Sequence, residues 1–197
     1  MANVFIKGTN GKVCASTTDY LLKDRIVTLE GEITECYANE IIRQLLILGS
    51  ESQAPITMII DSPGGSISAG LAIIDVMQML GDRVCCVCTC FAASMAAVIF
   101  AAGSQRLMLP HSRLMLHQAR VSGQINGGSE TLTQISKRLT EESEAVSMIL
   151  AESTGKTVKE IKKACSFDNY MTPEEAIAFG IADEVINRLD MIMEVVK

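Results

Sequence analysis

The sequence predicts an α/β fold in which short strands alternate with helices. Apolar runs of strand length are followed by segments of helical periodicity, and one repeat of this pattern takes roughly 25–30 residues, as βαβ units do. The run Ile-Thr-Met-Ile-Ile at 56–60 is almost continuously apolar, which is typical of a strand buried on both faces of a sheet. With 48% hydrophobic and 20% charged residues among 197, the chain has enough apolar material for one packed domain.

In chain order, the first two thirds supply most of these elements. We expect strands at 25–29, 56–60, 84–90, 106–109 and 113–117. Apolar residues at helical spacing predict helices at 38–46, 71–80 and 93–102. Asp-Ser-Pro-Gly-Gly at 61–65 is expected to break the second strand. Residues 1–18 are polar and mixed, so we expect an N-terminal arm or loop, followed by one domain over 19–197.

The last third begins with a glycine-rich connection at 123–128 and continues as one long predicted helix at 129–153. The apolar residues of this helix form a narrow seam close to a heptad pattern: Leu132, Ile135, Leu139, Val146 and Ile149. Such a seam fits an interface helix, and it equally fits a helix that packs back onto its own sheet.

Two shorter helices follow, each marked by a capping box. Thr157 with Glu160 and Thr172 with Glu175 have the required spacing, and Pro173 stands at the first helical position of the second helix. A final strand is expected at 184–186.

Composition excludes several classes of function. The net charge is −6 and no basic cluster stands out, so the sequence does not indicate nucleic-acid binding. The longest apolar stretch, 91–103, is shorter than the roughly 20 residues that a membrane-spanning helix needs. No secretory leader is visible, so we expect a cytoplasmic protein with reduced thiols. A mean hydropathy of +0.28 suggests that part of the surface is buried in an oligomer.

Two residues are candidates for nucleophile and base. Ser94 lies among small residues at a predicted strand-to-helix transition, where backbone N–H groups can stabilise negative charge; the alternative is an ordinary helix-capping serine. His117 directly follows a predicted strand and could act as a general base, or it could be hydrogen-bonded at a sheet edge. His111 follows Pro110 in a turn and is expected to be exposed.

Glycines and cysteines provide two further features. The turn at Gly64 and Gly65 can present backbone N–H groups to an oxyanion or a phosphate, although no Walker motif accompanies it. Cys86, Cys88 and Cys90 alternate along one predicted strand. Because no second cysteine cluster is present to complete a tetrahedral zinc site, we interpret them as core packing.

Five segments of the chain resemble the proteolytic subunits of Clp proteases, the ClpP family. They are Tyr-Leu-Leu-Lys-Asp-Arg-Ile at 20–26, Asp-Ser-Pro-Gly-Gly-Ser-Ile-Ser-Ala-Gly at 61–70, Ala-Ala-Ser-Met at 92–95, Leu-Pro-His-Ser-Arg-Leu-Met-Leu-His-Gln at 109–118, and Met-Thr-Pro-Glu-Glu-Ala-Ile-Ala-Phe-Gly-Ile-Ala-Asp at 171–183. The segments occur in the family's order over roughly residues 19–187, which makes the resemblance specific.

The resemblance implies a crotonase-like α/β head with a long-helix handle at about 123–153. It also implies a serine endopeptidase with Ser94 as nucleophile, His117 as general base and Asp168 as the carboxylate that orients the histidine. Asp168 is matched through the segment Tyr170-Met171-Thr172 that follows it, since spacing alone does not select it. The oxyanion hole would be formed by the backbone N–H groups of Gly65 and Met95.

The resemblance further implies assembly and partners. Family members form heptameric rings that stack through their handles into a tetradecamer, and the chain could form such a homo-oligomer or a mixed ring with another ClpP. An AAA+ unfoldase of the ClpX, ClpA or ClpC type would feed unfolded polypeptides into the chamber. No metal or organic cofactor is implied, because ATP is used by the unfoldase.

Several positions depart from the family pattern. Ala96 and Ala119 replace the usual glycine and proline, and Ser166 and Phe167 replace an acidic–arginine pair that helps to couple the two rings. Thr57 and Ile59 stand where aromatic residues of the unfoldase-docking pocket are common. Two alternatives therefore accompany the peptidase hypothesis: a weakly active or regulatory ClpP paralogue that needs a partner ring, and a crotonase-like acyl-CoA enzyme.

Overall fold

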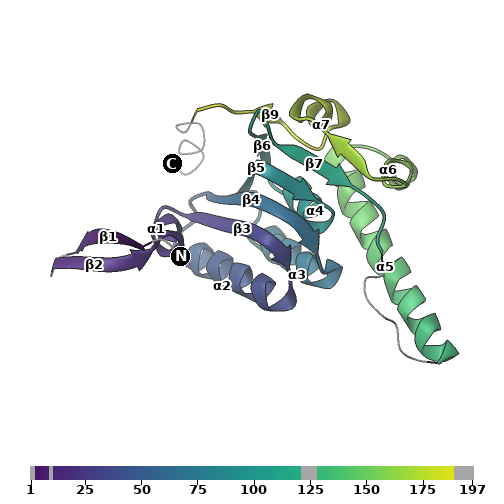
Figure 1. The fold of residues 1–197 in the computed structure, drawn as a ribbon, viewed down its shortest axis with the longest axis horizontal. Coiled ribbons are helices and arrows are strands. Elements are labelled where there is room, and N and C mark those ends of the chain that lie inside the picture. Colours follow the sequence, from purple (N-terminus) through teal and green to yellow (C-terminus); the bar gives the residue numbers. More distant parts are fainter. Residues whose placement is uncertain (1–2, 9–10, 121–127, 189–197) are drawn as a thin grey trace.

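In the computed structural model the described residues are 3–8, 11–120 and 128–188, and the chain folds around one mixed sheet (Figure 1). Five strands pair in parallel in the order β3 (Ile26–Ile33), β4 (Ile56–Gly65), β5 (Val84–Ala93), β6 (Gln105–Met108) and β9 (Glu184–Val185). A side branch leaves β5: β7 (Arg113–Leu116) pairs with it in parallel, and β8 (Asn169–Met171) pairs with β7 in antiparallel orientation. The α/β class predicted from the sequence is confirmed.

Helices cover the sheet and extend beyond it. The longer ones are α2 (Glu35–Glu51), α3 (Ile67–Met79) and α5 (Ser129–Thr154). The shorter ones are α1 (Thr17–Lys23), α4 (Met95–Ala101), α6 (Val158–Ala164) and α7 (Pro173–Phe179). In Figure 1, α2 and α3 lie along one face of the sheet, and α5 runs past its edge and projects away from it. Among the described residues, no helix is long and apolar enough to cross a membrane.

The apolar runs of the strands build the core. Met58, Ile60, Cys86 and Cys88 are fully buried and belong to one cluster with the helices. This confirms the packing role expected for two of the three alternating cysteines, and burial raises the pKa of the Cys88 thiol to about 12. The expectation is wrong for Cys90, which is exposed. Cys90 lies in the second half of β5, where its side chain faces solvent instead of the core.

The second strand runs further than expected. Asp-Ser-Pro-Gly-Gly does not break it: β4 continues to Gly65, and Glu32 and Ile33 of β3 pair with Gly64 and Gly65. The register against both neighbouring strands shifts within this segment, which allows a proline without an N–H group to lie in the strand. The extension matters for function because it carries the glycine pair to the end of β5.

The apolar seam of the long helix packs against the head at one end and is exposed at the other. Leu150, near its C-terminal end, is buried against the head, whereas Leu132 near its start is 49% exposed. Its length is confirmed to within a residue at Ser129–Thr154. Of the glycine-rich connection predicted at 123–128, residues 123–127 lie outside the described residues.

The remaining local predictions have mixed outcomes. Both capping boxes are present: Thr157 and Thr172 each accept a hydrogen bond from the backbone N–H of the glutamate three residues on. The N-terminal arm is more ordered than a loop, since β1 (Asn3–Gly8) and β2 (Gly11–Ser16) pair as an antiparallel hairpin that projects from the head in Figure 1. Strand β8 was not expected from the sequence.

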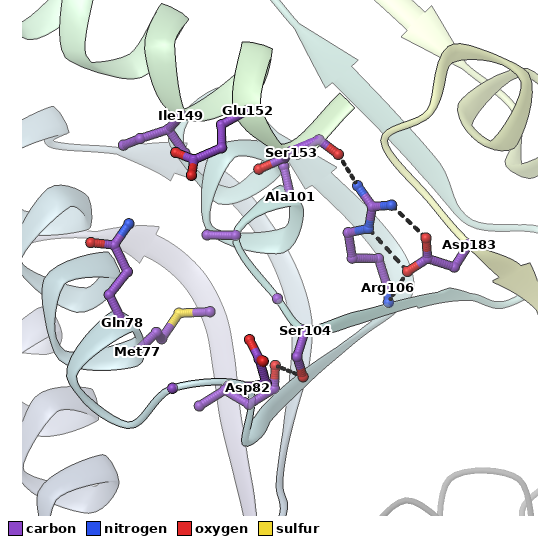
Figure 2. Close-up of a pocket in the computed structure, with 14 residues that line it drawn as sticks. Met77, Gln78, Asp82, Ala101, Ser104, Arg106, Ile149, Glu152, Ser153 and Asp183 are labelled. Carbon is purple, nitrogen blue, oxygen red and sulfur yellow. Dashed lines mark hydrogen bonds and ion pairs between the residues drawn. The ribbon is translucent and has the colours of Figure 1, made fainter. Parts of the chain in front are cut away.

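Arg106 attaches the end of the long helix to the head. Figure 2 shows its side chain reaching from β6 toward α5 and Asp183, beside a cavity of about 660 Å³. Nη1 donates hydrogen bonds to the carbonyls of Ser153 (2.7 Å) and Gly180 (2.9 Å), and the guanidinium forms an ion pair with Asp183. Burial by itself raises the pKa of Asp183, but the hydrogen bonds from Arg106 outweigh it and the net pKa is lowered.

We expect Arg106→Ala to lower the free energy of unfolding by about 2 kcal/mol, less than for a fully buried pair because Asp183 is 39% exposed. The loss should appear in urea unfolding followed by circular dichroism. Arg43→Ala removes an exposed ion pair with Glu40 and should change the value by at most about 0.5 kcal/mol. Equal effects of the two substitutions would contradict the clamping role.

Candidate active site

Ser94 lies at a sharp corner between β5 and α4. Its backbone has φ 54° and ψ −125°, a left-handed conformation that is strained for a residue other than glycine. The Ser94 N–H donates to the carbonyl of Met115 at 2.8 Å, which holds the corner against β7. The hydroxyl makes no capping hydrogen bond, so the interpretation of Ser94 as an ordinary helix cap is wrong. The corner presents this hydroxyl without assigning it a structural role.

Strand register brings the three residues of the predicted triad to one place. Ala93 of β5 pairs with Met115 of β7, and Leu116 of β7 pairs with Asn169 of β8. Ser94 and His117 therefore follow adjacent strand ends, and Asp168 directly precedes the strand that pairs with β7. Only backbone pairing is needed to collect residues that are separated by up to 74 positions in the sequence (168 − 94 = 74).

The last two residues of β4, Gly64 and Gly65, pack directly on the serine corner, and this end of the strand is called the glycine turn. Both glycines have positive φ, 92° and 154°. A Cβ atom on Gly64 would lie 2.6 Å from the Ala93 carbonyl oxygen and 2.9 Å from the backbone nitrogen of Met95, so no side chain fits there. Ser62 fixes the turn because its Oγ accepts a hydrogen bond from the Gly64 N–H at 3.1 Å. The two segments that carry Gly65 and Met95 are therefore in contact.

A small cavity opens beside Ser94 and His117, with a volume of about 40 Å³. The wall of the cavity combines polar residues with apolar side chains from three helices and β7: Ile67, Met95, Val98, Leu116, Val146 and Leu150. Such a cavity accepts an apolar group next to a hydroxyl and an imidazole. The larger cavity beside Arg106 contains none of the three triad candidates in its lining.

His117 and Asp168 lie near one another without a hydrogen bond between them. His117 Nδ1 is buried and has no hydrogen-bond partner. Asp168 Oδ1 instead accepts a hydrogen bond from Arg120 Nη2 at 2.5 Å. The pKa of His117 is lowered, first by burial and then by the positive charge of Arg120, while the charge of Asp168 acts in the opposite direction. Within the described residues, no hydrogen bond links His117 to Ser94 either.

Arg120 is the residue of this site that sequence reasoning missed. It is exposed, and it follows Gln118 and Ala119 after the end of β7. A single arginine in an irregular segment carries no periodic or motif signal. The antiparallel pairing of β8 with β7, itself unexpected, ends at Leu116 and Asn169 and so brings Asp168 beside the segment that follows β7 and carries Arg120.

Comparison with known proteins shows the family of this chain. The family model described as Clp protease matches residues 9–189. The chain belongs to the Clp protease family. The resemblance inferred from the five sequence segments is thereby confirmed, and family membership leaves the acyl-CoA enzyme alternative without support.

Two relatives from Chlamydia trachomatis, one from serovar D and one from serovar A, are both named ATP-dependent Clp protease proteolytic subunit 2. Each is 46% identical to this chain over 170 residues, which covers 85% of this chain and 83% of the relative. The chain is a homologue of Clp protease proteolytic subunits, and a second-paralogue character is compatible with the names of these relatives.

The close fit between the glycine turn and the serine corner leads to a test. We expect Gly64→Ala to lower peptidase activity by about 10²-fold or more, because the new Cβ displaces the Ser94–Met95 backbone by which an oxyanion would be held. The rate of hydrolysis of a fluorogenic peptide measures the effect. Gly81→Ala is the matched control, since Gly81 also has positive φ (67°) but has no atom within 4 Å of an added Cβ. Comparable losses in both variants would show that backbone strain alone is responsible.

Proposed function

We propose that the chain is a serine endopeptidase subunit that hydrolyses peptide bonds of unfolded polypeptides through Ser94, His117 and Asp168. The observation that carries this proposal is the register of β5, β7 and β8, whose strand ends carry the three residues. One of them, Ser94, has a strained backbone and a hydroxyl that caps no helix. Membership in the Clp protease family supports the same assignment.

The chemical steps follow from the positions of the groups. His117 takes the proton of the Ser94 hydroxyl, and the oxygen attacks the carbonyl carbon of the substrate. The tetrahedral intermediate expels the amine, which receives the proton from His117, and an acyl-enzyme remains. A water molecule, deprotonated by His117, then hydrolyses the ester and releases Ser94. Asp168 orients the imidazole once the two side chains are paired.

Backbone N–H groups of Gly65 and Met95 are proposed to bind the developing oxyanion. Contact between the glycine turn and the Ser94 corner supports this assignment, because it brings both donors beside the nucleophile. Each well-placed donor contributes on the order of 10²–10³ in rate. Every step uses a side chain, a backbone amide or water, so the proposed mechanism involves no metal or organic cofactor in this subunit.

The apolar cavity beside Ser94 is proposed to hold the side chain that precedes the cleaved bond. Met95, Val98 and Leu150 form part of its wall, and no charged side chain lines it. We therefore infer a preference for apolar residues at this position of the substrate.

We further propose assembly into heptameric rings that stack as a tetradecamer, fed by an ATP-dependent AAA+ unfoldase such as ClpX, ClpA or ClpC in the cytoplasm. Exposed apolar side chains on the helices support burial by other subunits or partners: Leu46, Ile47, Met79, Leu132 and Met148. All seven cysteines are free thiols, as expected in a reducing compartment.

A second candidate is a ClpP paralogue that is weakly active alone and needs a mixed ring. The observation that favours it is the unpaired Nδ1 of His117, with Asp168 held by Arg120. Thr57 adds to this view: it is fully buried, so it does not line an open docking pocket on the single chain. Phe167 is 61% exposed and cannot make the ion pair that its family position implies.

The nucleophile assignment is tested by Ser94→Ala. We expect this variant to lose peptidase activity by about 10⁴-fold or more and to lose labelling by a fluorophosphonate probe, because the attacking oxygen is absent. Mass spectrometry should locate the probe on Ser94 in the unmodified chain. Ser104→Ala, a serine beside the remote cavity, should keep both properties. Residual activity of Ser94→Ala near the wild-type level would refute the proposal.

The pH dependence of kcat/KM follows from the environment of His117. A general base must be neutral, and burial together with Arg120 lowers the pKa of His117 below the ordinary 6.5. We therefore expect the acidic limb of the profile to lie below pH 6.5, so that activity falls only when the pH drops beneath that value. An acidic limb above pH 6.5 would contradict this environment for the base.

A further inference from the structure

Two groups can pair with the carboxylate of Asp168, the guanidinium of Arg120 and the imidazole of His117. In this structure it pairs with Arg120. Arg120 Nη2 and Asp168 Oδ1 are 2.5 Å apart, and both side chains are about half exposed, 55% and 44%. On the other side, Nδ1 of His117 is buried from water and has no acceptor. A buried N–H or ring nitrogen without a partner is unfavourable, so His117 stands to gain from the carboxylate that Arg120 holds.

We propose that Arg120 is a positioning residue that withholds Asp168 from His117, and that the triad becomes competent when Arg120 releases this carboxylate. The inference rests on the proposed serine-peptidase function and deepens it by adding a control element. In the present arrangement His117 lacks the partner that fixes its tautomer, although the backbone register already places Ser94 and His117 at adjacent strand ends.

The ion pair between Arg120 and Asp168 is weak enough to form and break reversibly. An ion pair between two half-exposed side chains is weak, because solvent screens it and long side chains lose freedom when they pair. By contrast, a hydrogen bond from the buried Nδ1 to a carboxylate would be formed in a less polar environment. A modest competing contact for Arg120 is therefore enough to shift the equilibrium toward the paired triad.

Such competing acceptors lie in the adjacent cleft. Arg120 lines a cleft of about 410 Å³ that also contains Gly65, Glu32 and Glu35. Arg138, the other arginine of this cleft, already has a partner, since its Nε donates to Glu142 at 2.8 Å. Arg120 can therefore leave Asp168 for an acceptor in this cleft, such as the carboxylate of Glu32 or a carbonyl of a peptide seated there.

Two charged groups, Arg120 and Asp168, act on the pKa of His117. Arg120 lowers its pKa and Asp168 raises it, and both come from segments flanking the β7–β8 pair. Cys165, which lines the cavity shared with His117, has a pKa raised by burial and remains a neutral thiol. Removal of Arg120 therefore eliminates a cation and frees an anion at the same time, and both changes act in the same direction on His117.

The direct test is a titration of the histidines by NMR in the full-length chain. The sequence contains only His111 and His117, so ¹⁵N-histidine labelling gives two sets of ring signals, with His111 as the internal reference. We expect Arg120→Ala to move the His117 midpoint upward and to produce the Nδ1-protonated tautomer. Arg120→Lys retains a cation and should move it less. Arg43→Ala, which removes another exposed ion-paired arginine, should leave it unchanged.

Peptide hydrolysis provides the second readout. We expect Arg120→Ala to raise kcat/KM by about tenfold or more at neutral pH, since loss of the aspartate's role in a triad costs on the order of 10⁴ in kcat. The acidic limb of the profile should move to higher pH together with the NMR midpoint. In the Asp168→Asn background, Arg120→Ala should give no increase, because the gain is transmitted through the carboxylate.

Two results would overturn the inference. One is an unchanged or lower His117 midpoint in Arg120→Ala, and the other is a lower rate, which would mean that Arg120 holds Asp168 in its productive position. The NMR titration requires no catalysis and can be repeated in the Ser94→Ala chain. Failure of the proposed function, seen as hydrolysis that persists without Ser94, is therefore distinguishable from failure of the Arg120 assignment.

Discussion

The hydrogen-bonded register of three strands is the constraint on which the site depends. β5, β7 and β8 differ in length and direction, yet the pairs Ala93–Met115 and Leu116–Asn169 fix where each strand ends. A slip of one residue would turn the end residues to the opposite face of the sheet. The backbone ladder, rather than contacts between the side chains themselves, therefore places the strand ends that carry Ser94, His117 and Asp168 side by side.

Close packing without side chains is the second requirement. The turn at Gly64 and Gly65 can touch the Ser94 corner because β4 continues through its proline and because neither glycine carries a Cβ. Strain at Ser94 is maintained by the Met115 carbonyl on one side and this turn on the other. The strained backbone and the proposed oxyanion donors thus depend on one contact, which leaves no room for a Cβ atom on Gly64.

Much of this architecture follows from the sequence, and the exceptions have physical causes. Long periodic segments, such as the helix Ser129–Thr154, and capping boxes, such as Thr172 with Glu175, are encoded locally and were predicted. Strand β8 is three residues long and is stabilised by pairing with β7, so no local pattern announces it. Ser94 and His117 could be proposed from their places after strands, whereas Asp168 required the family resemblance and Arg120 was missed entirely.

Asp168 illustrates why the proposed set of catalytic residues is not yet a catalytic arrangement. Its backbone is fixed by the pairing of β8, but its side chain is half exposed. The carboxylate can pair either with the solvated guanidinium of Arg120 or with the buried imidazole of His117. Water weakens the first contact and leaves the second strong, so any contact that excludes water or attracts Arg120 favours the imidazole. Because Arg120 lines a cleft that also contains Gly65, a peptide bound there in the proposed mechanism would contact the arginine and act on this equilibrium. In the mechanism proposed above, activity therefore depends on the exchange of one exposed ion pair, Arg120 with Asp168, for a hydrogen bond between Asp168 and His117.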